Sequence, residues 1–190
     1  IIGLGYVGLP LAVEFGKKYS TIGFDIEKNR IEELKIGIDR TLELSAKQIS
    51  ISKNLIFSSE LKIIEKCNIY IITVPTPVDK HNVPDMTPLA LASKAVGGII
   101  NKNNIIVYES TVYPGATEEF CVPILEEESG LKYNKDFFCG YSPERINPGD
   151  KERTLTKIKK VTSGSNKKTT SYVDDLYKSI IPAGTFKVSS

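Results

Sequence analysis

The stretch Ile1–Gly8, which reads IIGLGYVG, contains the pattern G-x-G-x-x-G. A short apolar run precedes the pattern and an apolar helical pattern, Leu9–Phe15, follows it, which is the context that a dinucleotide-binding turn requires. Gly3 permits the tight turn, Gly5 lets the backbone approach a pyrophosphate, and Gly8 lets the helix pack closely against the strand. The helix N-terminus offers unpaired N–H groups to the phosphates. The stretch therefore predicts a strand–turn–helix unit that binds a dinucleotide.

An acidic residue ends the second predicted strand. Asp25 lies about 20 positions after Gly5, where a carboxylate reaches the ribose hydroxyls of the adenosine. A carboxylate there repels a 2′-phosphate, so the position favours NAD over NADP. The structural alternative is a glycine-rich turn followed by an Asp that caps the next helix. Because strand, glycines, helix, strand and acid fall in register, we favour the NAD site.

Short apolar, β-branched runs alternate with helical patterns along the whole chain. Two near-continuous apolar runs, Asn68–Val74 and Asn104–Glu109, are typical of strands buried on both faces of a parallel sheet. The other strands are expected at Ile1–Leu4, Thr21–Ile26, Leu55–Ser58, Phe137–Ser142, Lys160–Gly164 and Thr185–Val188. The helices are expected at Gly8–Tyr19, Lys28–Lys35, Glu60–Lys66, Pro88–Asn101, Pro114–Ser129 and Asn166–Ile181. This order predicts an α/β, Rossmann-like, doubly wound and mainly parallel sheet with helices on both faces, and leaves Ile38–Ser52 as a long connection.

The composition is that of a globular protein: of 190 residues, 41% are hydrophobic and 25% charged. The length fits one large domain or two small ones. A formal net charge of +2 gives no electrostatic footprint for nucleic acid, and no apolar run approaches the roughly 20 residues of a membrane span. Three cysteines without C-x-x-C spacing argue against a disulfide framework and a zinc site. We therefore expect no metal, nucleic-acid or membrane partner, and a reducing, cytoplasmic compartment.

Three later motifs accompany the opening glycines in order. They are TVPTP at Thr73–Pro77, ESTVYPG at Glu109–Gly115 and YSPERINPG at Tyr141–Gly149. Together with GLGYVGLP at Gly3–Pro10 and with Asp25, they resemble the UDP-glucose/GDP-mannose dehydrogenases, the nucleotide-sugar 6-dehydrogenases. The P-E-R-x-N-P-G form is similar to the branch that oxidises UDP-N-acetylhexosamines, with glucosamine, galactosamine and mannosamine all open as the sugar.

Enzymes of this family have an N-terminal NAD-binding domain, a long central helix and a C-terminal UDP-sugar domain. The chain, residues 1–190, resembles only the first and opens without Met, so we expect a fragment with a truncated first strand and without the central helix and sugar domain. For the intact protein the resemblance implies a homodimer that makes surface polysaccharide precursors. Its reaction is a four-electron oxidation of a sugar C6 alcohol to a carboxylate by two NAD⁺ and one water, through a thioester on a catalytic cysteine.

The resemblance also places residues on the cofactor. Tyr6 and Val7 fall at the pyrophosphate turn, and Arg30, a little more than one helical turn beyond the ribose-binding acid, is expected against the adenosine. Thr76 and Thr111 are expected to end two strands at the carboxyl edge of the sheet, where open α/β sheets bind ligands. Thr111 is implied to hold the catalytic water or the nicotinamide side; the alternative is a cap for the next helix.

On the substrate side, Glu144 matches a family carboxylate that acts as general base or orients the water. Arg145 is implied to bind sugar or pyrophosphate oxygens, and Asn147 the acetamido sugar. The alternatives are surface salt bridges for Glu144 and Arg145, and a turn-forming Asn before Pro148. Pro148 also stands where UDP-glucose dehydrogenases often have a second Glu, so the role of that Glu is not carried over.

None of the cysteines matches the family's catalytic Cys motif, so Cys67, Cys121 and Cys139 are expected to be small buried hydrophobes. His81, the only histidine, is expected to be a solvated loop residue. The run Lys157–Lys160 is expected to form a solvated face. Because the Cys segment is missing, we expect this chain alone to bind NAD weakly and not to turn over.

Two other interpretations remain open. A 3-hydroxyacyl-CoA or 6-phosphogluconate type dehydrogenase shares the opening turn, although the motifs Val74–Pro77 and Ser142–Gly149 argue against it. A non-enzymatic domain that senses NAD(H) shares the turn as well, and the near-neutral charge neither favours nor opposes it. The coding sequence downstream of Ser190 distinguishes the three, because a Gly-x-Cys segment there is typical of the nucleotide-sugar dehydrogenases.

Overall fold

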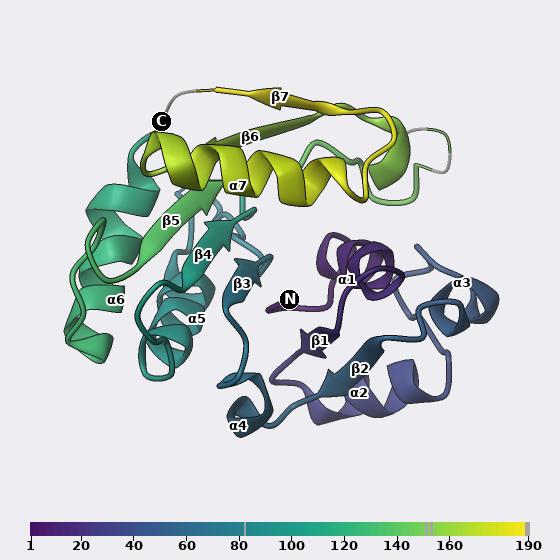
Figure 1. Ribbon diagram of the computed structural model, residues 1–190. Coiled ribbons are helices and arrows are strands. Elements are labelled where there is room, and N and C mark those ends of the chain that lie inside the picture. The colour runs from purple at the N-terminus through teal and green to yellow at the C-terminus, as the bar shows by residue number, and fades with distance from the viewer. Residues whose placement is uncertain (82, 151, 153, 189–190) are drawn as a thin grey trace.

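The computed structural model describes residues 1–81, 83–150, 152 and 154–188, and in it strands and helices alternate (Figure 1). The strands are β1 (Thr21–Phe24), β2 (Leu55–Ser58), β3 (Ile69–Ile72), β4 (Ile105–Tyr108), β5 (Phe138–Tyr141), β6 (Lys160–Gly164) and β7 (Thr185–Lys187). The α-helices are α1 (Gly8–Gly16), α2 (Lys28–Lys35), α3 (Ala46–Ser50), α4 (Leu61–Ile64), α5 (Thr87–Gly97), α6 (Val122–Ser129) and α7 (Lys167–Lys178). A π-helical turn spans Thr117–Cys121, and a 3₁₀ turn spans Leu155–Lys157.

Ile2 joins two groups of strands. β1 pairs with β2, and the second group has the order β3-β4-β5-β6-β7. Between the groups, Ile2 forms parallel bridges to Phe24 of β1 and to Ile72 of β3. The named strands all pair in parallel except β5 and β6, which are antiparallel. The expected Rossmann-like, mainly parallel sheet is therefore confirmed, with one antiparallel pair near its far edge.

Alternate residues of β3 face opposite sides of the sheet, and helices cover both sides (Figure 1). Tyr70 and Ile72 pack with residues of α5 and α6, whereas Ile71 packs with residues of α1 and α7. All three side chains are at most 3% exposed. A further cluster, which includes Leu9 and Ile31, joins α1 to α2. The doubly covered sheet explains why the sequence of β3 is apolar throughout rather than alternating.

Two of the expected elements, the first strand and the helix expected to begin at Pro114, differ from the structure. The strand expected over Ile1–Leu4 is wrong as a regular strand, because only Ile2 forms bridges and the chain turns at Gly3, whose φ is +91°. The helix expected over Pro114–Ser129 begins instead at Thr117, with the π-helical turn that leads into α6. Both corrections concern the boundaries of elements, where local propensity decides little.

The long connection expected over Ile38–Ser52 is also wrong in part, because it contains the short helix α3. Ser45 and Gln48 form a capping box: the Ser45 hydroxyl accepts the backbone N–H of Gln48, and the Gln48 side chain accepts the backbone N–H of Ser45. This reciprocal arrangement satisfies N–H groups that a helix start otherwise leaves unpaired. It is a local sequence signal for the helix.

Gly8 lets α1 approach the turn that follows Ile2. A Cβ added at Gly8 would lie 1.8 Å from the carbonyl oxygen of Gly3 and 2.4 Å from Oγ1 of Thr73. Thr73 Oγ1 in turn lies within hydrogen-bond distance of the carbonyl oxygens of Ile2 (3.0 Å) and Gly3 (2.7 Å). The helix start, the turn and the end of β3 are therefore in direct contact, and a side chain at Gly8 has no space.

Substituting Gly8→Ala should lower the free energy of unfolding by about 2 kcal/mol or more, because backbone cannot move aside as a flexible side chain does. Urea unfolding followed by circular dichroism measures this loss. Gly5→Ala is the matched control, since a Cβ at Gly5 meets nothing within 4 Å. Equal stability of the two variants would contradict the packing role of Gly8.

Candidate functional site

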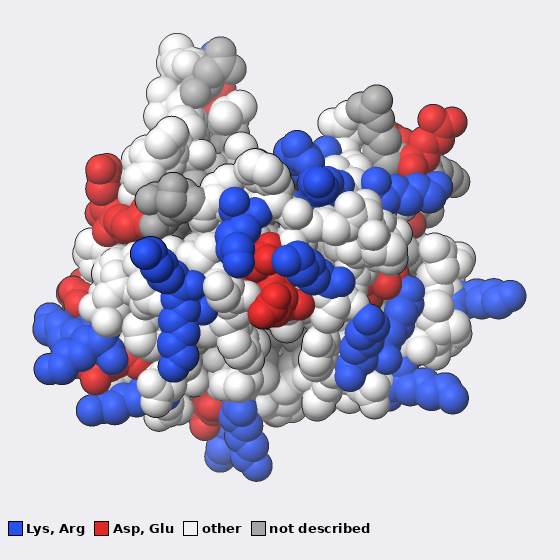
Figure 2. All heavy atoms as spheres, turned by 45° about the horizontal axis from the view of Figure 1, so that its top comes forward, with Lys and Arg blue, Asp and Glu red and all other residues white. Residues whose placement is uncertain are grey.

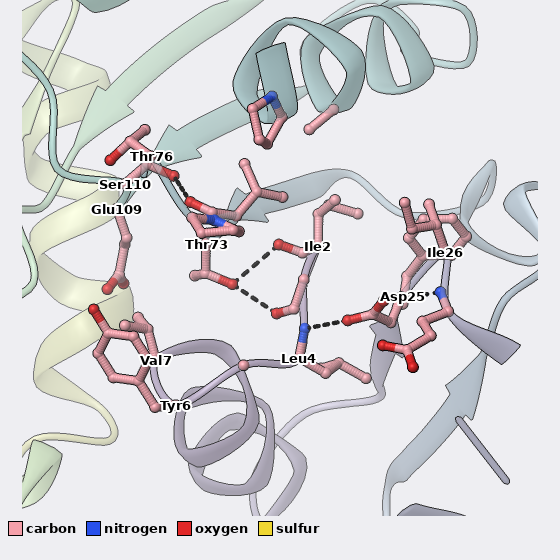
Figure 3. A pocket seen from close by; sticks show the side chains of 18 of the residues that line it. Ile2, Leu4, Tyr6, Val7, Asp25, Ile26, Thr73, Thr76, Glu109 and Ser110 are labelled. Carbon is pink, nitrogen blue, oxygen red and sulfur yellow. Dashed lines mark hydrogen bonds between the residues drawn. The ribbon is translucent and has the colours of Figure 1, made fainter. Parts of the chain in front are cut away.

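A cavity of about 880 Å³ opens beside the glycine turn, next to the carboxyl ends of β1, β3 and β4. Its size is within the range of roughly 300–1,000 Å³ that ligand pockets occupy. Figure 3 shows Asp25 at one end of this pocket and Glu109 at the other, with the turn at Leu4 between them. The pocket lies at the edge where open α/β sheets bind ligands.

The glycine turn forms one wall of the pocket. Gly3, Gly5, Tyr6 and Val7 all line it. A Cβ at Gly5 would stand in open space, and Val7 at the N-cap of α1 makes no side-chain hydrogen bond to the helix start. The N–H groups of the first turn of α1 therefore lie beside the pocket, and no N-cap side chain accepts a hydrogen bond from them. A helix start of this kind favours the binding of a phosphate. Gly8 stands behind this wall, packed on the turn.

Asp25 is fixed at the pocket rim by main-chain donors (Figure 3). Its Oδ2 accepts the N–H of Leu4 at 2.8 Å, and its Oδ1 accepts the N–H of Glu27 at 3.0 Å. The N-cap of α2 is Glu27, so Asp25 is not the helix cap of the structural alternative. The carboxylate is held directly against the glycine turn, and each of its oxygens keeps a free lone-pair direction for a hydroxyl donor.

Arg30 also lines the pocket, but the residue is buried, with only 3% of its surface exposed. Nε donates to the carbonyl oxygen of Leu4 at 2.9 Å, and Nη2 donates to Asp39 Oδ1 at 2.7 Å. Nη1 has no hydrogen-bond partner among the described residues. The side chain therefore buttresses the glycine turn and keeps one donor unused; contact with an adenosine stays a prediction.

Asp39 neutralises this buried arginine and organises the loop that follows α2. Besides Arg30, its carboxylate accepts the N–H groups of Thr41 and Leu44, each at 3.0 Å, and the hydroxyl of Thr41 at 2.7 Å. Burial alone raises the pKa of Asp39, but the hydrogen bonds from Thr41, Leu44 and Arg30 outweigh it and hold the pKa below the usual value. The loop is thus tied to the pocket wall through one charged pair.

The structure brings Thr76 and Thr111 together. Thr76 Oγ1 donates to the carbonyl oxygen of Thr111 at 2.7 Å, and Ser110 Oγ donates to the carbonyl oxygen of Val74 at 2.6 Å. Both threonines line the pocket, although each lies a few residues past its strand rather than at the strand end. The next helical turn begins at Thr117, so the alternative of Thr111 as a helix cap is wrong.

Glu144 reaches the far end of the pocket and pairs with a buried lysine. Lys160 Nζ lies 2.8 Å from Glu144 Oε2 and 2.7 Å from Glu109 Oε2. Many lysines and arginines stand out from the face that α7, β6 and β7 form (Figure 2), but Lys160 is 3% exposed. The expectation of a solvated face at Lys157–Lys160 is therefore wrong for Lys160, and a surface salt bridge is wrong for Glu144, because both side chains turn inward.

Sequence reasoning missed Glu109 and Lys160. Glu109 stands at the end of an apolar strand inside the motif Glu109–Gly115, and Lys160 opens a strand of mostly small and apolar residues. A lone charge at a position expected to be buried is a signal that it has a partner. What the sequence does not show is which partner, because these residues are 51 positions apart.

Arg145 and Asn147 lie outside the pocket wall. Both are exposed, and the guanidinium of Arg145 donates to the carbonyl oxygen of Lys159. The carbonyl oxygen of Asn147 accepts the N–H of Asp150 at 3.1 Å, as in a turn. The structure thus brings Glu144 to the pocket but not its two neighbours, and their contacts with a substrate stay predictions.

The cysteines do not provide a nucleophile. Cys121 and Cys139 are each 1% exposed, as expected, while Cys67 is half-buried, and all three are free. Burial raises the pKa of the Cys121 thiol to about 11 and raises that of Cys139 well above its usual value, which opposes thiolate formation. The side chain of His81 is 70% exposed, and its Nδ1 lies 3.7 Å from Oδ2 of Asp79. His81 is therefore a solvent-exposed loop residue, as expected.

The described residues offer no candidate for a membrane-spanning helix or for a metal site. None of the helices there is long and apolar enough to cross a membrane. No group of three or more His, Cys, Asp or Glu side chains in the described part of the chain is arranged to hold a metal ion. The polar groups of the pocket are carboxylates, hydroxyls, main-chain donors and two arginines, the buried Arg30 and the exposed Arg40.

Comparisons with known proteins agree with this geometry. Residues 1–181 match the NAD binding domain of the UDP-glucose/GDP-mannose dehydrogenase family. Over all 190 residues the chain is 59% identical to a UDP-N-acetyl-D-glucosamine 6-dehydrogenase from Pseudomonas aeruginosa and 57% identical to one from Salmonella typhi, covering 45% of each. The solved UDP-D-ManNAc dehydrogenase from Pyrococcus horikoshii is similar over 100% of this chain and 46% of its own, with a TM-score of 0.88 and 28% identity. The chain thus spans less than half the length of these relatives.

Substituting Asp39→Asn should lower the free energy of unfolding at neutral pH by about 3 kcal/mol or more, because it leaves the buried Arg30 charge uncompensated. The folded pKa of Asp39 lies below its unfolded value, so its stabilisation is present above about pH 4 and is lost as the pH falls toward the folded pKa. Urea unfolding across the acid range measures both effects. The variant should therefore lose less stability on acidification than the unchanged chain.

The exposed Asp175 of α7 supplies the matched control, since Asp175→Asn removes a carboxylate that is not buried. Its stability and its acid dependence should stay close to those of the unchanged chain. An Asp39→Asn variant with the same acid dependence as Asp175→Asn would contradict the assignment of a lowered pKa to Asp39.

Proposed function

Because the chain belongs to the UDP-glucose/GDP-mannose dehydrogenase family and matches its NAD-binding domain, we propose that it binds the NAD of a UDP-N-acetylhexosamine 6-dehydrogenase. The observation that carries the proposal is Asp25, whose carboxylate is fixed by the N–H of Leu4 beside an open glycine turn. The activity, substrate and partners of the intact protein are part of the proposal, since its relatives are about twice as long as this chain.

The pocket fits NAD in shape and in chemistry. The open space at Gly5 and the N–H groups of the first turn of α1 suit the pyrophosphate, with Gly3, Tyr6 and Val7 around it. The Asp25 carboxylate suits the two ribose hydroxyls of the adenosine, and Arg30 lines the same pocket. When bound, NAD⁺ supplies a hydride acceptor. The protein's contribution is to fix the two ends of the cofactor.

At the far end of the pocket, Thr111 and Glu144 carry the proposed chemistry. Thr76 holds the backbone at Thr111, so that the Thr111 side chain orients a water or the nicotinamide side. Glu144 orients the hydrolytic water or takes its proton, as a general base does. Arg145 and Asn147 are proposed to meet the sugar nucleotide from outside the pocket wall. The nucleophilic thiol is proposed to come from another part of the intact protein, because burial raises the pKa of Cys67, Cys121 and Cys139 and so disfavours their thiolates.

The proposed substrate is UDP-N-acetyl-D-glucosamine, which two relatives at 59% and 57% identity carry in their names. The galactosamine and mannosamine epimers are the alternatives. The overall reaction oxidises the C6 alcohol to a carboxylate with two NAD⁺ and one water, for a surface polysaccharide precursor. We further propose that the intact protein is a homodimer in the cytoplasm; the free state of all three cysteines supports a reducing compartment.

Cofactor preference tests the site on the chain itself. Isothermal titration should show NAD⁺ binding at least about tenfold more tightly than NADP⁺, because the Asp25 carboxylate repels a 2′-phosphate. Asp25→Ala should reduce the ratio of the NADP⁺ to the NAD⁺ dissociation constant, because it weakens NAD⁺ binding and removes the charge that repels the 2′-phosphate of NADP⁺. Asp175→Ala, on α7 and away from the pocket, should leave it unchanged. A ratio that survives Asp25→Ala would contradict the assignment.

Activity tests the proposed reaction on the intact protein. With UDP-N-acetyl-D-glucosamine and NAD⁺, about two NADH should form for each UDP-sugar oxidised, measured by absorbance and by mass spectrometry of the product acid. The present chain alone should bind NAD⁺ and form no NADH. Tight NAD binding without turnover of any of the three N-acetylhexosamine nucleotides would instead favour an NAD(H)-sensing domain.

A further inference from the structure

Resting on the proposed function of Glu144, we infer that Lys160 is a positioning residue, whose buried ammonium fixes the orientation of the Glu144 carboxylate at the pocket wall. Lys160 does not line the pocket, whereas Glu144 and Glu109 both do. It therefore acts through its neighbours and not on a ligand. The inference adds a residue from β6 to a site that the sequence motifs place at the ends of β1, β3, β4 and β5.

The contacts of Lys160 hold one oxygen of Glu144 and one of Glu109. Its Nζ lies 2.8 Å from Glu144 Oε2 and 2.7 Å from Glu109 Oε2. The side chains of Lys160, Glu109 and Glu144 are 4%, 0% and 7% exposed. At this burial an ion pair is not screened by water, and removing one member leaves an uncompensated charge.

The other oxygen of Glu144 is held by the backbone. Glu144 Oε1 accepts the N–H of Arg145 at 2.6 Å and the N–H of Ile146 at 2.8 Å. Three donors from two segments, the loop after β5 and the start of β6, thus converge on one carboxylate. A group held in this way keeps a single orientation toward the pocket, as a residue that orients water or takes its proton must.

Glu109 is held in turn from α7. The Tyr177 hydroxyl donates to Glu109 Oε1, and Lys160 Nζ lies 6.0 Å from the centre of the Tyr177 ring. Burial raises the pKa of Glu109; the Lys160 charge lowers it, and the Glu144 charge raises it again. Burial lowers the pKa of Lys160, but the two carboxylates outweigh it, so that its pKa lies above the usual value. The pKa of Glu109 stays above its usual value on balance, because burial is the largest influence on it. The ammonium lies between the two buried carboxylates and offsets their mutual repulsion.

The remaining polar neighbours do not replace that ammonium. Tyr141 of β5 interacts electrostatically with both Lys160 and Glu109. Burial raises the pKa of its hydroxyl, so Tyr141 stays neutral near pH 7. Tyr177 also stays neutral, because burial raises its pKa well above the usual value. The guanidinium of Arg145 is exposed and donates to the carbonyl oxygen of Lys159. Without Lys160, Glu109 and Glu144 would face each other and share a proton.

Stability alone is a weak reason for this cluster. A buried arrangement of two carboxylates and one ammonium loses more in desolvation than a hydrophobic replacement of similar volume does, and such replacements are often neutral or stabilising. The cluster lies at the wall of the pocket, which its two acids line and its lysine does not. A positioned charge at the site is the gain that offsets the cost.

The test compares Lys160→Met with Lys159→Met in the intact protein, acting on UDP-N-acetyl-D-glucosamine. Lys159 is adjacent and exposed, so its variant should behave as the unchanged protein. Lys160→Met should lower kcat at least about tenfold with little change in KM, since general acid–base groups contribute factors of about 10²–10⁴. The acid limb of its kcat–pH profile should move to higher pH, because Glu144 then shares a proton with Glu109. A folded Lys160→Met variant with an unchanged kcat and pH profile overturns the inference.

Glu109→Gln separates charge from structure. As a single substitution, Glu109→Gln keeps the Lys160–Glu144 pair and removes the negative charge of Glu109. The acid limb of the kcat–pH profile should therefore move to lower pH. When Glu109→Gln is combined with Lys160→Met, the acid limb of the kcat–pH profile should return toward the pH at which the unchanged protein has it. If Lys160→Met fails to fold, Glu109→Gln alone decides, and an unmoved acid limb counts against the inference.

Infrared spectra of the intact protein provide a readout that needs no turnover. Near neutral pH, Lys160→Met should show the band of one additional protonated carboxyl group, and the double variant with Glu109→Gln should show less of it. Absence of that band in a folded Lys160→Met variant overturns the inference even if the intact protein does not oxidise UDP-N-acetyl-D-glucosamine. Inactivity of the unchanged protein with the band present counts only against the proposed substrate.

Discussion

Contact between two stretches of backbone, at Gly8 of α1 and at Gly3, determines where the pocket lies. An ordinary side chain at Gly8 would overlap the Gly3 carbonyl oxygen, so only glycine lets the helix start touch the turn. Thr73 closes the same junction from β3 through the carbonyl oxygens of Ile2 and Gly3. Because helix, turn and strand meet here, the N–H groups of α1 and the strand ends border one cavity.

Around that junction, polar side chains support the wall rather than fill it. Arg30 reaches the Leu4 carbonyl oxygen from α2, and Asp39 neutralises it from the following loop. Asp25 takes the Leu4 N–H on the same short segment. One residue of the turn is thus held through both its backbone groups, which gives the turn a fixed shape before any ligand arrives. Such preorganisation reduces the entropy that binding costs.

Features that depend on short stretches of sequence could be predicted, whereas contacts between residues far apart in the sequence could not. Glycine spacing and Asp25 are fixed by short-range geometry, and the apolar run of β3 by burial on two faces, so each was predictable. The short helix α3 has a local signal in the capping box of Ser45 and Gln48, but its five residues are too few to show a helical period of apolar residues. The lysines next to Lys160 in the sequence predict a solvated residue, because its two carboxylate partners lie 51 and 16 positions away and leave no local signal.

The two ends of the pocket therefore differ in how their acids are held. Asp25 is held by main-chain N–H groups, which do not titrate, so its geometry does not depend on the charge of a neighbouring side chain. Glu144 shares an ammonium with a second buried carboxylate, so its orientation depends on Lys160. A carboxylate that only binds hydroxyls needs the first arrangement. One that takes a proton from water needs a fixed orientation and a charged neighbour, and the second arrangement supplies both.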